Sequence, residues 1–167
     1  MVFDRNAINT GRRIQDFGLC DLKGVYQNTA KMRAKGFLVV AFLMPTDAAS
    51  VKVARTLQDW TTLGERVAIA AVTLGEPGDA ESLAESAQLG YPVLWDFETY
   101  VTPQWAVSAV PAVFVIDAGG VVLGRVVGAN DSELAAAKSM LAELVRKADE
   151  AAKAAAEAAA AAAAEKK

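Results

Sequence analysis

The sequence predicts an α/β fold with three layers, in which a central mixed β-sheet is flanked by helices. Two largely apolar runs, residues 37–43 and 66–74, are typical of parallel strands that are covered on both faces. An amphipathic segment follows the first run, and Ala118-Gly119-Gly120 is a hairpin signal between two further apolar segments. Helices between parallel strands, followed by an antiparallel hairpin at one edge, predict this fold class.

After an N-terminal hairpin, the predicted elements alternate between strand and helix. Gly36, Gly64 and Gly90 follow helical segments and are expected to end them. In chain order, the elements are a hairpin at 14–26 with its turn at 21–24, helical turns at 28–35, a strand at 37–43, a helix at 48–63, a strand at 66–74, a helix at 79–89, a strand at 92–95, a helical turn within 99–106, strands at 112–117 and 121–127, and a helix after Asn130.

Side-chain caps are predicted at the start of the two longest helices. Asp47 or Thr46 is placed to accept hydrogen bonds from the free amides of the first turn of the helix at 48–63. Asn130, with Glu133 three residues later, matches a capping box. The last helix then has one apolar stripe that faces the sheet, formed by Leu134, Ala137, Leu141, Leu144 and Ala148.

The chain divides into three regions. Residues 1–13 are polar and aperiodic, which predicts a flexible N-terminal arm, and residues 14–148 form the α/β domain. Residues 149–167 are mostly alanine and have no large apolar side chain. Alanine favours helix, and the preceding helix removes the cost of nucleation, so we expect a protruding helical extension that frays. It is either a solvated low-complexity segment or a helix that docks a partner.

The composition excludes several classes of site. The net charge of −3 is small, and lysine and arginine are scattered, so no nucleic-acid interface is predicted. The sequence has no histidine and one cysteine, Cys20, which excludes an internal disulfide and a cysteine-based zinc site. We therefore predict neither metal nor cofactor. No apolar run is long enough for membrane insertion. The expected location is the cytoplasm for the chain as written, or the periplasm if a leader has been removed.

Two segments match a known active-site pattern. The pattern Phe-Trp-Ala-x-Trp-Cys-Pro-x-Cys places Phe42 on its phenylalanine, Asp47 on its first cysteine and Ser50 on its second. Val110-Pro111 matches a conserved cis-proline, and the residues from Phe114 to Gly120 match the strand and turn that follow it. Over residues 14–145 the chain resembles the thioredoxin-like superfamily, in particular the redoxins (TlpA-like and AhpC/TSA-like proteins).

The chain departs from this family at the residues that perform its chemistry. Asp47 cannot form a mixed disulfide, and Ser50 has no histidine to activate it. A carboxylate at a helix N-terminus is stabilised as an anion and is a poor acid–base group near neutral pH. Asp47 also fits the role of an N-cap, and Ser50 that of a first-turn residue. The peroxiredoxin pattern Pro-x-x-x-Thr-x-x-Cys fits no better, because from Pro45 it places Lys52 at the cysteine.

The resemblance still implies a binding surface. In the family, the cis-proline exposes the backbone of the preceding residue, which pairs with an extended substrate. The corresponding residues here form the predicted binding set. Trp95 is a further aromatic residue near this set. Trp95 and Trp105 would otherwise belong to the core. The set consists of Thr46, Asp47, Ser50, Val110, Pro111 and Trp105.

Cys20 is expected at the tip of the first hairpin, beside Asp21 and away from any helix N-terminus. Such a thiol is either inert or acts with an external thiol.

Three functions therefore remain open. The first is a redox-inactive module that binds a protein or an extended peptide at the Pro111 loop. The second is a thiol-disulfide oxidoreductase or peroxiredoxin-related antioxidant protein that uses Cys20. The third is a structural or assembly protein that uses its C-terminal tail.

Overall fold

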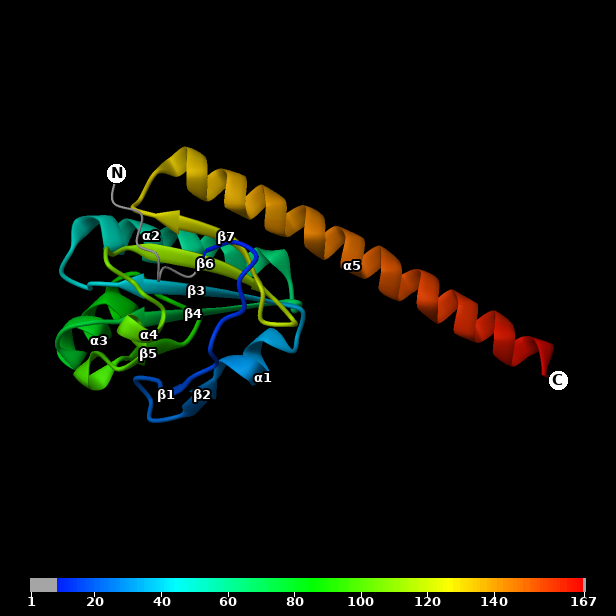
Figure 1. Ribbon diagram of the computed structural model, residues 1–167, viewed down its shortest axis with the longest axis horizontal. Helices are drawn as coiled ribbons and strands as arrows, with labels where there is room; N and C mark the ends of the chain where they lie inside the picture. Colours follow the sequence, from blue (N-terminus) through cyan, green and yellow to red (C-terminus); the bar gives the residue numbers. More distant parts are fainter. Residues whose placement is uncertain (1–8, 167) are drawn as a thin grey trace.

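The computed structural model describes residues 9–166. A five-stranded sheet with the order β5-β4-β3-β6-β7 forms the centre, and a separate two-stranded sheet pairs β1 with β2 (Figure 1). β3, β4 and β5 are parallel, whereas β6 is antiparallel to both β3 and β7. The strands are β1 (Gly18–Cys20), β2 (Tyr26–Asn28), β3 (Phe37–Leu43), β4 (Val67–Thr73), β5 (Val93–Trp95), β6 (Ala112–Asp117) and β7 (Val122–Val127). The mixed sheet and its terminal hairpin were both predicted, so the fold class is confirmed.

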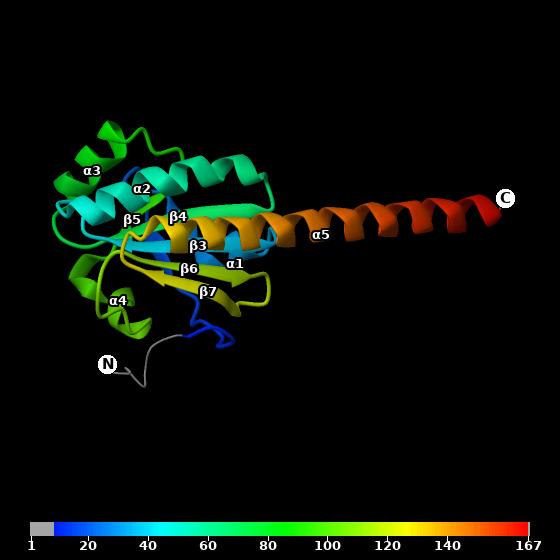
Figure 2. The ribbon, with the colours of Figure 1, turned by 90° about the horizontal axis from the view of Figure 1, so that it is seen from above.

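Helices cover both faces of the sheet. Figure 2 shows α2, α3 and α5 on one side and α4 on the other. The helices are α1 (Thr29–Arg33), α2 (Ala48–Trp60), α3 (Pro77–Ser86), α4 (Val101–Gln104) and α5 (Asp131–Glu165), with 3₁₀ turns η1 (Thr61–Leu63) and η2 (Phe97–Thr99). Because β3 is the central strand, its side chains alternate between two buried clusters, and no polar residue interrupts it.

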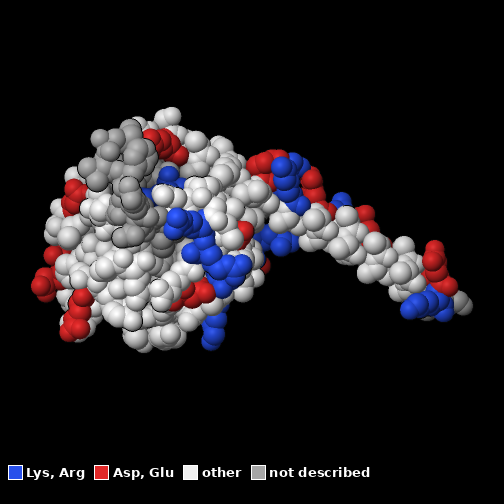
Figure 3. Space-filling view, viewed as in Figure 1, with Lys and Arg blue, Asp and Glu red and all other residues white. Residues whose placement is uncertain are grey.

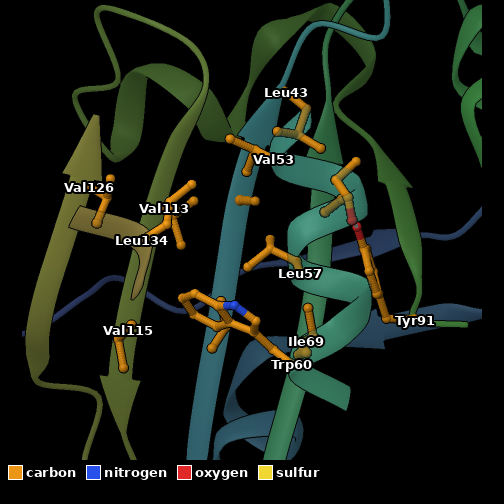
Figure 4. Close-up of a cluster of buried hydrophobic side chains, with 14 of the residues drawn as sticks. Leu43, Val53, Leu57, Trp60, Ile69, Tyr91, Val113, Val115, Val126 and Leu134 are labelled. Atoms are coloured by element: carbon orange, nitrogen blue, oxygen red, sulfur yellow. Dashed lines mark hydrogen bonds between the residues drawn. The ribbon is translucent and has the colours of Figure 1, made fainter. Parts of the chain in front are cut away.

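The cluster beneath α2 and α5 contains Trp60, Leu57 and Leu134 (Figure 4). Tyr91 reaches the same cluster, and its hydroxyl donates a hydrogen bond to the Ala54 carbonyl at 2.7 Å. Burial raises the pKa of this hydroxyl above its ordinary value, so it remains a neutral donor. The polar tip of the tyrosine is therefore satisfied where the side chain is buried.

Three of the predicted boundaries differ from the structure for reasons that its contacts and backbone show. The first hairpin is shorter than predicted, because the amide of Ile14 donates to the Gly120 carbonyl instead of pairing within the hairpin. α3 begins at Pro77, since proline is well suited to the first helical position. It ends at Ser86, and Gln88 then adopts a positive φ of 49°.

The predicted N-terminal arm is partly bound to the domain. The amide of Gly11 donates to the Val122 carbonyl, and the amide of Val122 donates to the Arg12 carbonyl. Arg13 forms an antiparallel bridge with Val121. The expected flexibility is therefore wrong for residues 11–13, which pair with the first residue of β7 and the residue before it. Residues 1–8 of the arm lie outside the described part of the chain.

α5 has a packed half and a projecting half. Leu134, Leu141 and Val145 are buried against the sheet, and an ion pair between Arg66 and Asp149 lies where the helix leaves the domain. From Asp149 to Lys166 every residue is exposed, and the helix projects well beyond the domain (Figure 1). Helix propensity, rather than tertiary packing, therefore maintains this half of α5.

Candidate functional site

The topology brings the two predicted segments together. β3 and β6 are antiparallel neighbours, and Phe42 is opposite Ala112 in their register. The turn that follows Leu43 and the Val110-Pro111 segment that precedes Ala112 therefore lie at the same edge of the sheet, on adjacent strands. The ends of β4 and β5 lie at this edge as well, because both strands are parallel to β3.

Asp47 and Ser50 form the beginning of α2. Asp47 is its N-cap, and its Oδ2 accepts a hydrogen bond from the Ser50 amide at 2.9 Å. Ser50 is completely buried, and its Oγ accepts a hydrogen bond from the Met44 amide at 3.1 Å. The carboxylate and the hydroxyl therefore join the end of β3 to the helix, which is a structural function. As a binding residue Ser50 is a wrong prediction, since no part of it reaches the surface.

The peptide bond between Val110 and Pro111 is cis. Pro111 is buried, and its carbonyl accepts a hydrogen bond from the Gly128 amide at 2.8 Å, which attaches the loop to the end of β7. Val110 is half-buried, and its backbone N–H and C=O have no hydrogen-bond partner within residues 9–166. The main cavities of residues 9–166 are lined by other residues; Thr46 is exposed, and Asp47, like Val110, is half-buried.

Trp105 supports this loop from beneath and does not line a groove. Its indole is completely buried among Phe17, Phe42 and Phe114, with ring centroids 5.2–5.5 Å apart. Its Nε1 donates to the Gln15 carbonyl at 3.1 Å. The predicted role of Trp105 in binding is therefore wrong, because a ligand at the surface cannot reach it; the alternative interpretation, a core residue, holds.

Asp96 is a buried carboxylate that the sequence analysis did not identify. Its side chain accepts hydrogen bonds from the amides of Tyr100, Val101 and Thr102 and from the Thr102 hydroxyl, at 2.6–3.1 Å. It is 3% exposed. These contacts fix the segment between β5 and α4, and hence the position of Trp105. The donors follow four to six residues after the aspartate, which matches no standard capping motif and left no signal in the sequence.

Cys20 lies at the end of β1 and is exposed. Its neighbour Asp21 forms an isolated antiparallel bridge with Leu94 on β5, which places the hairpin beyond the β5 edge of the five-stranded sheet. Three strand spacings of about 4.8 Å therefore separate Cys20 from β3. The thiol is not at the position where α2 begins, and no disulfide geometry connects it with that turn.

The described residues 9–166 contain neither a helix that is long and apolar enough to cross a membrane nor a group of three potential metal-ligating side chains. The site therefore consists of an exposed threonine, a capping carboxylate and an unpaired stretch of backbone. These groups can form hydrogen bonds with a ligand. They do not include a thiol.

The similarity of this chain to known proteins is found among solved structures and not among sequences. The sequence matches no family model, and no curated protein matches it. Among solved structures, the peroxidoxin BcpB of Mycobacterium tuberculosis is 20% identical with a TM-score of 0.70, over 84% of this chain and 97% of that one. A protein classed as the thiol:disulfide interchange protein DsbE of Chlorobium tepidum is 19% identical with a TM-score of 0.73, over 83% and 99%.

The thioredoxin domain of a thiol-disulfide oxidoreductase from Bacteroides vulgatus is 15% identical, with a TM-score of 0.70 over 81% of this chain and 99% of that one. At these identities the likeness concerns the fold. It covers nearly the whole length of each related structure, and the strand order and the cis bond at Pro111 are consistent with it. The chain has a thioredoxin-like fold.

Proposed function

We propose that this protein binds an extended protein segment at the Val110-Pro111 loop and does not exchange disulfides there. The observation that supports the proposal is the start of α2, where Asp47 and Ser50, which the family resemblance aligns with a dithiol, are engaged in hydrogen bonds of their own. A carboxylate and a buried hydroxyl can neither donate the two electrons that reduce a substrate disulfide nor accept the two electrons that a substrate dithiol releases on oxidation.

The backbone of Val110 provides the means of binding. Its N–H and C=O have no partner within residues 9–166, and both lie beside the exposed Thr46 turn. An extended peptide can pair with such groups as an added strand does, and its side chains then contact the adjacent surface. This recognition requires only a fixed backbone, which the hydrogen bond between Gly128 and Pro111 secures.

Thr46→Trp tests the site with S-carboxymethylated insulin B chain, an extended peptide without free thiols. Because the indole would occupy the surface beside Val110, we expect the affinity to fall by at least about tenfold, or 1.4 kcal/mol. The measurement is an NMR titration that follows the Val110 amide. Thr62→Trp is the matched control, since Thr62 is an exposed threonine in η1, at the other end of α2. Equal affinity in the two variants, or no shift at Val110, would contradict the proposal.

A second candidate function is an oxidoreductase that uses Cys20 with an external thiol. It is favoured by one observation, the exposure of the only cysteine. We expect no reduction of insulin disulfides above the rate of dithiothreitol alone, for the protein and for Cys20→Ser alike, because a single thiol has no resolving partner. Turnover by the unmodified protein that disappears in Cys20→Ser would establish the second function and remove the first.

A further inference from the structure

A second surface, away from the Pro111 loop, has the features of an interaction site. A groove of about 380 Å³ lies between the β1–β2 hairpin, α3 and the residues that end and follow β5. Its volume is within the range of ligand-binding pockets. Most of its lining is apolar, and Cys20 forms part of its wall. The lining residues are Leu19, Cys20, Asp21, Leu22, Gly24, Pro77, Glu81, Trp95 and Phe97.

Aromatic side chains form one side of this groove. The rings of Trp95 and Phe97 are in contact, with centroids 5.0 Å apart, and Trp95 is fixed by a hydrogen bond from its Nε1 to the Gly75 carbonyl. Phe97 is nevertheless 59% exposed. Large apolar side chains that remain exposed beside a groove mark sites of interaction. Tryptophan is among the residues in which binding hot spots are enriched.

The segment after Phe97 is held in a strained conformation. Glu98 and Thr99 have positive φ values of 60° and 51°, although neither is glycine. The buried carboxylate of Asp96 holds the amides that follow them, which fixes the strained turn. Backbone strain of this kind persists only where the surrounding structure enforces it, and it concentrates at functional segments.

The charged residues that line the groove are acidic. Asp21 and Glu81 are the only charged residues in its lining, and neither forms an ion pair within residues 9–166. Lys23 lies in the hairpin turn next to Asp21. Between Arg66 and Arg125 the chain has seven acidic residues and no lysine or arginine. Acidic side chains are accordingly seen at the end of the molecule that contains α3, whereas lysine and arginine lie nearer α1 (Figure 3).

The carboxylate of Asp21 is a fixed anion. Burial alone would raise its pKa, but hydrogen bonds from the Val25 amide, the Gln27 side chain and the Lys23 amide lower the pKa below its usual value. These donors also hold the side chain in place, so its orientation is set before any ligand arrives.

We propose that this groove binds a protein segment in which an aromatic or aliphatic side chain lies next to lysine or arginine. The apolar side chain would enter between Leu22 and Trp95, and the cation would lie near Asp21 and Glu81, over the face of Phe97. A cation that contacts both a carboxylate and an aromatic ring is favoured by charge and by the ring quadrupole. The site is distinct from the Pro111 loop, because it lies beyond β5, whereas the loop precedes β6, and β4 and β3 separate these two strands in the sheet.

Cys20 offers a direct measurement of occupancy, since it is the only thiol and lines the groove. Its thiolate attacks the neutral reagent 4,4′-dithiodipyridine, forms a mixed disulfide and releases one coloured thiopyridone. The probes are three peptides of equal length: one alternates lysine with phenylalanine and leucine, one has glutamate for lysine, and one has glycine for the apolar residues. At saturation we expect the first to slow modification by at least about fivefold and the others by less than about twofold.

Variants locate the bound peptide. Glu81→Lys and Phe97→Ser are expected to remove the protection, because the first brings a like charge to the peptide and the second removes the exposed ring. Glu85→Lys is the matched control: it is an exposed glutamate of the same helix outside the groove lining, and its protection should be unchanged. Circular dichroism establishes that each variant is folded, and Glu81→Gln provides a milder change.

Equal protection by the glutamate peptide, none by the lysine peptide, or full protection in both Glu81→Lys and Phe97→Ser would overturn the proposal. Loss of protection in Thr46→Trp would assign the peptide to the Pro111 loop instead.

Discussion

Asp96→Ala is expected to lower the free energy of unfolding by about 3–4 kcal/mol, because it leaves three buried or half-buried amides and a hydroxyl without their acceptor. Hydrogen bonds to a carboxylate are stronger than those between neutral groups. The space that alanine would leave at this buried position gives little access to water that could replace them. The loss is measured by urea unfolding, with tryptophan fluorescence as the signal. A loss of stability below about 1 kcal/mol would show that the segment before α4 is fixed by other contacts.

Two further variants separate the carboxylate from the loop around it. Asp96→Asn keeps one acceptor oxygen and places an NH₂ group against the amides, so its loss should be smaller than that of alanine but still measurable. Glu98→Ala lies two residues away and is exposed, and it should change stability by less than about 0.5 kcal/mol. Fluorescence of the native state provides a second signal, since Trp105 is packed directly after this segment and should become more mobile only in the Asp96 variants.

The sequence predicted the elements that short-range patterns determine. β3 and β6 begin and end where their apolar runs do, and Asp47 caps α2 because its carboxylate is one residue before the first helical turn. The Asn130 cap of α5 follows the same logic, and its side chain accepts from the Glu133 amide as predicted. For the two caps, the interaction that fixes the helix start lies within about four residues of sequence, and for the two strands the apolar run is itself a local pattern.

What the sequence could not provide depends on long-range contacts or on unusual backbone conformations. Trp105 is a core residue because Phe17, Phe42 and Phe114 converge on it from three separate segments. The amides that Asp96 holds follow Glu98 and Thr99, which have positive φ. Neither residue type indicates this conformation in the sequence. The groove at Cys20 depends on the Asp21–Leu94 bridge between the hairpin and β5. Each of these features needed the fold before it could be identified.

Asp47→Cys combined with Ser50→Cys, in a Cys20→Ser background, is expected to create a dithiol that reduces insulin. Residues three apart at a helix start have Cβ atoms about 5–6 Å apart, which allows a disulfide after a small adjustment. The free amides of α2 would stabilise a thiolate at position 47 and lower its pKa. We expect turnover at least about tenfold above the rate of dithiothreitol alone, and a reduced form that is less stable by about 1 kcal/mol because the cap is lost.

The matched control is Ala48→Cys with Val51→Cys in the same background, which shifts the pair by one residue and keeps its spacing. Its thiols lie at the same helix terminus. Neither thiol, however, occupies the N-cap position or the buried position that Ser50 fills. Activity in the first pair and not in the second would show that the scaffold still presents positions 47 and 50 to a substrate, so the missing chemistry follows from two side chains. If the first pair is folded, forms a disulfide and has no reductase activity, this edge of the sheet does not receive a disulfide substrate, and the proposed kinship of the site with the redoxins is wrong.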